Sequence, residues 1–525
     1  MSKKSLLFIV IVVSISFSVF GSPRRDTAKG DIHLTGPIRG GEQGWPYGAY
    51  YGNIRNIGYV EEEYFIEGNA VLYNLTGEWT TDGKWTLERG RTFPYKTRLL
   101  VHRPADSAEF NGTVIVEWAN VTSGYEMAFV DIAGMPDLVD RGFAYVLASV
   151  QPISVNGFQN PQAPSREVRA VGTSMTVQAA PADLTRGGLR TWDPQRYGSL
   201  SIPNDGISYD IFTQIGIAVG PNRKTLTSGV DPMGGLTVRN LIGIGGSQSG
   251  IRILSYTNGV QPLENVYSAL IPAMGSGQGV DFLEAIAADR TAPDPNPEAR
   301  RIRPAMIRDD LTIPVMVFNS ESEADWTFEA RQPETDRFRH WEVAATSHAG
   351  PRKMQLENLK TDRDGITYSL HHIASTRQAE LDWQPVLSAA FWHIHNWVNG
   401  EGPPPSFPPI AITQTNGRIE IQRDQYGNAI GGVRLPALEV PFANYSVVLR
   451  TRILPSSFTI PFSTSYLRQL YPTHDDYVAQ VTEAVNRALE TGVLLRIGAD
   501  EYIRRARAAP VPEASYPDAL RQFLR

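Results

Sequence analysis

Runs of apolar residues, each of a length that suits one strand, recur along the chain and alternate with segments of helical spacing. Thr113–Trp118 (TVIVEW) is typical, because it is apolar almost throughout and not only at every second position; this indicates a strand covered on both faces. Such strands separated by helices predict an α/β fold with a mostly parallel central sheet and helices on both faces. The expected strands are Tyr59–Phe65, Thr97–His102, Thr113–Trp118, Ala144–Val150, Val238–Ile244, Ile313–Phe318 and Trp341–Ala345. Helices are expected over Asp210–Val219, Gln384–Val398 and Asp476–Gly492. Asp137–Gly142 is expected to be the end of a further helix, and Gly250–Tyr256 the beginning of another.

Polar stretches rich in proline and glycine interrupt this alternation at Gln151–Ser208 and at about Ala273–Thr312. Long segments of this kind in an α/β protein are expected to be lids or walls of a pocket. The stretch from about Asp31 to Pro104 is expected to be a β-rich N-terminal extension. The residues from about Leu381 onward are expected to be a C-terminal extension packed on the core. Residues 22–525 are therefore expected to form one domain with insertions.

Composition narrows the function classes. The 525 residues are 42% hydrophobic and 20% charged, with a formal net charge of −6 and no basic block, so nothing indicates a nucleic-acid partner. A small neutral or apolar molecule is the expected ligand. The chain has no cysteine, which excludes disulfides, thiol nucleophiles and cysteine-based metal sites.

The N-terminus has the pattern of a secretory signal peptide. Lys3 and Lys4 precede an apolar run from Ser5 to Phe20, and Val19 and Gly21 are small residues placed for cleavage after Gly21. An uncleaved membrane anchor is the alternative, although the run is shorter than the ~20 residues that a spanning helix needs. We expect an exported protein, periplasmic or secreted, without stable membrane insertion after cleavage.

The segment with the clearest chemistry is Gly245-Gly-Ser-Gln-Ser-Gly250, where an expected strand ends and a helix begins. A tight strand-to-helix turn of this kind lifts a serine hydroxyl off the sheet as a nucleophile. Ser247 is the expected nucleophile; Ser249 is the rival, but it lacks a glycine two positions before it. The backbone N–H of Gln248 is expected to donate to a developing oxyanion.

Two other glycine motifs do not fit this segment. A dinucleotide fingerprint that starts at Gly243 needs a glycine at position 248, where glutamine stands. A phosphate-binding loop needs a lysine after Gly250, where Ile251 stands. The strict elbow Gly-x-Ser-x-Gly also differs by one residue, since its second glycine falls at Gly250.

An acid and a base are expected after later strands, because the order on such a fold is serine, acid, histidine. The strand near Ile313–Phe318 is followed by three carboxylates; spacing favours Glu323 as the acid, with Glu321 and Asp325 as alternatives. His348, flanked by small residues after a short strand, is the expected base. The pairs His371-His372 and His393-x-His395 are expected to be packed or surface histidines and not metal ligands.

Together these segments resemble the "alpha/beta hydrolase domain" family of secreted, esterase-like proteins. The resemblance is carried by Gly58–Phe65, Val116–Gly124, Gly142–Gln151, Gly245–Gly250, Asn319–Glu323, Arg331–Arg339, Trp341–His348 and Asp424–Pro436. It implies the α/β-hydrolase fold, Ser247 as nucleophile, His348 as base, and Glu323 at a position where the family often has aspartate. The Gly-x-Ser-x-x-Gly elbow also resembles that of glucuronoyl esterases.

The loop after Thr113–Trp118 is expected to provide a second oxyanion donor, Ala119 or Asn120, although Asn120 could instead cap a turn. The whole predicts a serine hydrolase that acts on a small ester without a metal or organic cofactor, esters being preferred to amides on family grounds alone. Acyl transfer to an alcohol or amine by the same residues is one alternative. A catalytically silent binding protein on a hydrolase scaffold is the other.

Overall fold

The structure of the protein is a computed structural model. It describes residues 32–157, 167–170, 173–176, 188–223, 226, 228–282, 302–366, 381–416, 418–448 and 456–513. The expected signal peptide at residues 1–21 and the pair His371-His372 lie outside these ranges. None of the helices within them is both long and apolar enough to cross a membrane.

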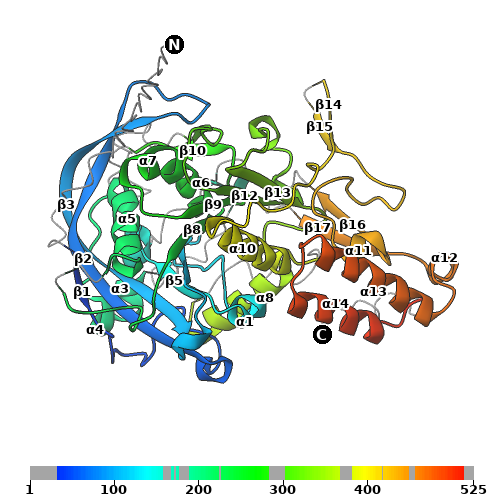
Figure 1. Ribbon diagram of the computed structural model, residues 1–525, viewed down its shortest axis with the longest axis horizontal. Coiled ribbons are helices and arrows are strands. Elements are labelled where there is room, and N and C mark those ends of the chain that lie inside the picture. The colour runs from blue at the N-terminus through cyan, green and yellow to red at the C-terminus, as the bar shows by residue number, and fades with distance from the viewer. Residues whose placement is uncertain are drawn as a thin grey trace, which may run out of the picture.

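A twisted sheet of nine strands forms the centre of the described part (Figure 1). In spatial order the strands are β1 (His33–Thr35), β2 (Tyr59–Thr76), β3 (Thr86–Pro104), β5 (Ala144–Ala148), β4 (Thr113–Trp118), β8 (Asn240–Gly246), β9 (Ala269–Ala273), β12 (Val315–Ser320) and β13 (Phe338–Val343). The strands from β5 to β13 are parallel, whereas β1, β2 and β3 add an antiparallel edge. The prediction of a mostly parallel sheet is confirmed.

The sheet has a separate apolar core on each face, because successive side chains of a strand point to opposite sides. Val114 and Val116 belong to the first core and Ile115, between them, to the second. Helices α5 (Ser208–Val219) and α6 (Gln248–Ser255) contribute to the first core. Helices α1 (Pro136–Asp140) and α10 (Gln384–Val398) contribute to the second core, and α8 (Pro351–Arg363) follows β13 in the chain. Helices therefore cover both faces, as the continuous apolar runs predict.

Several strands differ in extent from the prediction. The two N-terminal pieces are parts of a long hairpin, β2 and β3, with a bulge between Val71 and Tyr73. Strand β9 was not predicted, since Pro272 lies inside it and proline is unusual in a central strand. The strand ends at Ala273, the residue near which the second insertion is expected to begin.

The described parts of the two expected insertions hold short elements. The first contains α2 (Pro152–Asn156), β6 (Glu167–Ala170), β7 (Thr173–Thr176), α3 (Leu189–Trp192), α4 (Pro194–Tyr197) and the 3-10 turn η4 (Asp205–Ile207). The second contains β10 (Gln278–Val280), paired with β11 (Ile302–Pro304). A π-helical turn η6 (Tyr256–Val260) and α7 (Gln261–Glu264) continue α6. A role for the insertions as lids stays a prediction.

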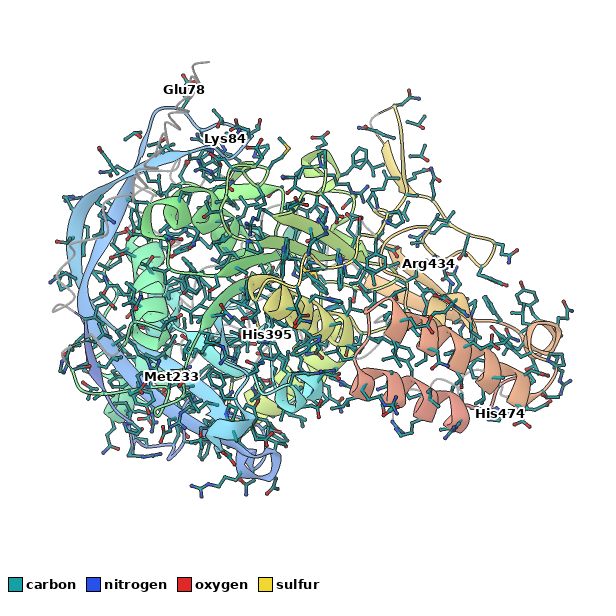
Figure 2. The ribbon with its side chains drawn as sticks, in the orientation of Figure 1. Glu78, Lys84, Met233, His395, Arg434 and His474 are labelled. Atoms are coloured by element: carbon teal, nitrogen blue, oxygen red, sulfur yellow. The ribbon has the colours of Figure 1, made fainter. Side chains whose placement is uncertain are left out.

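The C-terminal extension lies beside the β13 edge of the sheet, yellow to red in Figure 1. Its elements are β14 (Ile412–Thr415), β15 (Arg418–Ile421), α11 (Pro436–Glu439), β16 (Ala443–Val448), β17 (Ser456–Pro461), α12 (Thr464–Leu470), α13 (His474–Glu490) and α14 (Arg496–Ala508). A third apolar core joins it to Ala324 and Ala344, which lie just beyond β12 and β13. Figure 2 shows Arg434 near this junction and His474 toward the far end.

Candidate active site

Ser247 stands alone between the last residue of β8 and the first of α6. Its backbone has φ 61° and ψ −121°, a region that costs a residue with a side chain about 1–3 kcal/mol. The N–H of Ser247 donates to Ala273 O at the end of β9 (2.9 Å), and its carbonyl accepts from Ile251 N–H in α6 (3.0 Å). Neighbouring elements therefore hold the strained turn from both sides.

Two glycines of the turn are required by close packing. A Cβ atom on Gly246 would lie 2.3 Å from the ring of Phe129, and one on Gly250 would lie 2.1 Å from the carbonyl oxygen of Ala273. Real Cβ atoms do not approach other atoms so closely. The contact of α6 with β9 thus explains why the second glycine of the motif is at position 250.

The rival serine has a different role in the turn. Ser249 is fully buried. Its Oγ accepts from Gly246 N–H (3.0 Å) and donates to the carbonyl of the same residue (2.9 Å). The Ser249 hydroxyl is thus used to close the turn that presents Ser247.

The structure brings three of the sequence-predicted side chains into one hydrogen-bonded chain. His348 Nε2 lies 2.9 Å from Ser247 Oγ, and His348 Nδ1 lies 2.8 Å from Glu323 Oε1. They come from the ends of β8, β13 and β12, which meet at one edge because the strands are parallel. The Glu323 side chain is 1% exposed and that of His348 23%, so the imidazole is open to solvent while the carboxylate is not.

Glu323 is held in place by the turn that carries it. It ends the 3-10 turn η7 (Glu321–Glu323), whose N-cap is Ser320. Glu323 Oε2 accepts from both the backbone N–H (2.8 Å) and the hydroxyl (2.6 Å) of Ser320, and Oε1 accepts from Ser322 Oγ (2.8 Å). This reciprocal capping orients the carboxylate toward the imidazole.

The two alternative acids lie elsewhere in this segment. Glu321 is completely buried, and its carboxylate accepts from Ala345 N–H (2.6 Å). Its pKa is raised by burial, in part offset by Arg423. Asp325 is half-buried in the turn after η7. Of the three carboxylates, Glu323 is the one in hydrogen-bond contact with His348.

The expected oxyanion donors differ in what they bond. Gln248 opens α6, so its backbone N–H has no acceptor within the helix. The N–H of Ala119 donates to Ala148 O and that of Asn120 to Met127 O. Asn120 also donates through Nδ2 to Gly246 O (2.8 Å) and accepts from Thr122 N–H (2.9 Å), as a turn-capping asparagine does. One Nδ2 hydrogen of Asn120 is not used by the Gly246 contact.

Glu117 is a buried carboxylate in β4 that was not among the predicted site residues. It accepts from the N–H groups of Phe129 (2.5 Å) and Val130 (2.8 Å) and from the hydroxyl of Tyr145 (2.9 Å). Burial raises its pKa to about 7, in part offset by these hydrogen bonds. Glu117 thereby fixes the loop between β4 and α1, in which Phe129 packs against Gly246 and Asn120 bonds the Gly246 carbonyl. The sequence signal that could have identified Glu117 is a charged residue inside the otherwise apolar strand Thr113–Trp118.

The histidines of α10 bind protein groups. His393 Nε2 lies 2.8 Å from Gly492 O, and His395 Nδ1, on the helix in Figure 2, lies 2.7 Å from Thr113 Oγ1. Across the ranges given above, no three His, Asp or Glu side chains gather in a way that could hold a metal ion.

The order of the strands, parallel from β5 to β13, and the sharp turn that carries Ser247 at the end of β8 together define the α/β-hydrolase fold. A sequence model of the "alpha/beta hydrolase domain" family matches residues 34–504. The chain belongs to this family.

Solved structures similar to the chain include Est1E from Butyrivibrio proteoclasticus, at 12% identity and a TM-score of 0.24, covering 58% of this chain and 100% of that one. XC6422 from Xanthomonas campestris, described as an α/β serine hydrolase without a lid, has 12% identity and a TM-score of 0.24, with coverage of 53% and 91%. A glucuronoyl esterase from Solibacter usitatus has 8% identity and a TM-score of 0.24, with coverage of 60% and 84%. No curated protein sequence matches the chain.

Proposed function

We propose that the protein is a serine hydrolase that cleaves carboxylic esters through an acyl-enzyme on Ser247. The observation that carries the proposal is the chain Ser247 Oγ to His348 Nε2 to Glu323 Oε1, with separations of 2.9 and 2.8 Å. These separations lie within the range for a nucleophile, its base and the group that orients the base. Membership of the family supports the same class of chemistry.

In the first half-reaction Ser247 Oγ attacks the ester carbonyl carbon while its proton passes to His348 Nε2. The imidazolium then gives that proton to the leaving alkoxide oxygen as the carbon–oxygen bond breaks, which leaves the acyl group on Ser247. A water repeats the attack, with His348 again as base, and releases the carboxylic acid. Glu323 keeps the Nδ1–H tautomer, which leaves Nε2 free to accept the serine proton.

As Ser247 attacks, negative charge develops on the carbonyl oxygen of the ester, and hydrogen-bond donors are needed to stabilise it. We assign the first donor to the backbone N–H of Gln248, because it lies at the start of α6, where the helix dipole also favours negative charge. We assign the second donor to Asn120 Nδ2 and not to a backbone N–H, because those of Ala119 and Asn120 bond other carbonyls.

The test is turnover of chromogenic esters of increasing acyl length by the wild type and by Ser247→Ala and His348→Ala. Each variant is expected to lose roughly 10⁴-fold or more in kcat, because either one removes the whole proton-transfer unit. Circular dichroism checks that the variants fold. Glu323→Ala is expected to lose far more activity than Asp325→Ala, the matched control. Near-normal turnover by the Ser247 or His348 variant contradicts the assignment.

The two alternatives leave different results. Acyl transfer would divert product from the acid to a new ester or amide when an alcohol or amine is added. A silent binding protein would show no turnover, and a fluorophosphonate would not label Ser247 in the folded wild type. The hydrolase predicts both labelling and release of the free acid.

The proposal includes export, which rests on the N-terminal segment Lys3 to Gly21. Sequencing of protein recovered outside the cytoplasm is expected to start at Ser22. Recovery of a membrane-bound chain that retains Met1 contradicts it.

A further inference from the structure

We propose that Glu321 is a positioning residue for His348 and that the C-terminal extension supplies Arg423 as the cation that pairs with it. The inference rests on the proposed function, since it concerns the base of that reaction. The inference links the C-terminal extension to the active site, and it assigns a role to Glu321, which does not contact His348.

The first observation is the contact of Glu321 with the turn before the base. Ala345 has a φ of 60°, which a residue other than glycine rarely adopts. Its N–H donates to Glu321 Oε2 at 2.6 Å. A bond to an ionised carboxylate is about twice as strong as a neutral one. Ala345 stands three residues before His348, so this bond sets where the loop leaves β13.

The second observation is the partner of the other carboxylate oxygen. Arg423 Nη1 lies 2.7 Å from Glu321 Oε1, with the Glu321 side chain 0% and the Arg423 side chain 25% exposed. A carboxylate without solvent contact stays ionised only when a cation or donors compensate for the lost hydration. Arg423 comes from the C-terminal extension, so the cation that compensates for the burial of Glu321 is supplied by that part of the chain.

The same extension also binds the backbone on the strand side of the turn. Val433 N–H donates to Glu342 O (2.7 Å), and Ala344 N–H donates to Val433 O (3.1 Å). Ala344 and Ala345 share an apolar core with Leu438 and Tyr445 of the extension. Backbone pairing and the Glu321–Arg423 pair therefore hold the His348 loop from one side.

The test compares Glu321→Ala, Glu321→Gln, Arg423→Met and the double variant Glu321→Gln/Arg423→Met with wild type. The control is Arg487→Met, which breaks an exposed pair with Glu439 in the same extension. Measurements are kcat and KM for a chromogenic ester and the rate at which a fluorophosphonate labels Ser247. A further readout, independent of activity, is the downfield proton NMR signal of the imidazole N–H bonded to Glu323, identified by its loss in His348→Ala.

Arg423→Met and Glu321→Ala are expected to lower kcat and the labelling rate about tenfold or more, with KM within about twofold. Glu321→Gln keeps an acceptor for Ala345 N–H and is expected to lose less than Glu321→Ala. The double variant is expected to recover much of the loss of Arg423→Met, because no unpaired buried charge remains. A merely structural pair would also show this rescue in stability, but it would not lower kcat at unchanged KM or change the imidazole N–H signal in a variant that stays folded.

The inference is overturned if the wild type turns over ester while Glu321→Ala and Arg423→Met keep kcat within twofold. It is also overturned if the downfield signal is unchanged in both variants. If the wild type neither hydrolyses esters nor is labelled, the proposed function fails by itself. The NMR signal then decides the positioning role alone: its loss in Arg423→Met supports that role.

Discussion

At the scale of the residue, the site combines local strain with three buried carboxylates, each of which bonds a different loop or side chain around Ser247 and His348. Glu323 faces His348, Glu321 faces Ala345, and Glu117 faces the N–H groups of Phe129 and Val130. The backbone of Ser247 and of Ala345 has positive φ. Such strain persists only where surrounding bonds hold it, and here carboxylates and carbonyls of neighbouring strands supply those bonds.

Glu117 gives a prediction for stability against pH. Its pKa is raised to about 7 in the folded protein from an ordinary value of 4.5. The folded state therefore binds the Glu117 proton more tightly than the unfolded state does. The contribution of protonated Glu117 to the stability of the fold is therefore largest below pH 4.5. That contribution is lost as pH rises through 7. Relative to Glu117→Gln, which cannot titrate, the wild-type free energy of unfolding is expected to fall by about 3 kcal/mol across this range.

Urea unfolding of both proteins between pH 5 and pH 8 measures this difference, most of which lies in that window. The control is Glu78→Gln on the exposed hairpin tip labelled in Figure 2, which should run parallel to the wild type. If the difference in the free energy of unfolding between wild type and Glu117→Gln is the same from pH 5 to pH 8, Glu117 does not titrate in this range.

At the scale of the element, strands with continuous apolar residues were predicted well. Thr113–Trp118 and Gln384–Val398 have the predicted bounds, and the strand and helix around Ser247 differ by a few residues. Strand β9 was missed, because Pro272 breaks the local pattern while parallel neighbours on both sides still hold the strand. Helix α8 was missed as well, since its mostly polar surface lacks a clear apolar stripe.

At the scale of the whole molecule, a buried ionic cluster ties the antiparallel edge of the sheet to the loops near the site. Arg98 of β3 contacts Glu63 of β2 (2.7 Å) and Glu126 in the loop after β4 (2.5 Å). Arg196 of α4 bonds the second oxygen of Glu63 (2.6 Å). The three acidic and basic side chains around Arg98 are at most 3% exposed, so each charge depends on its partners.

Arg98→Met is expected to destabilise the fold by about 3–5 kcal/mol, because it leaves Glu126 buried without its cation. Urea denaturation at pH 7 measures the loss. Arg468→Met is the matched control: it breaks an ion pair with Glu513 in which both side chains are more than half exposed, and no measurable change is expected. Equal midpoints for the two variants would show that the buried cluster contributes no more than a surface pair.

The sequence by itself determined the class of fold and predicted the candidate site residues Ser247, His348 and Glu323, the last with two alternatives. Apolar runs and glycine spacing depend on residues close together in the chain, and Ser247 and His348 each stood in one recognisable context. Only the tertiary structure decided which of three neighbouring carboxylates meets His348, and that Glu321 and Glu117 hold loops. Those choices depend on contacts between segments far apart in sequence, such as Glu321 with Ala345 and Arg423. Local patterns carry no information about such contacts, because they arise when the sheet and the extension pack together.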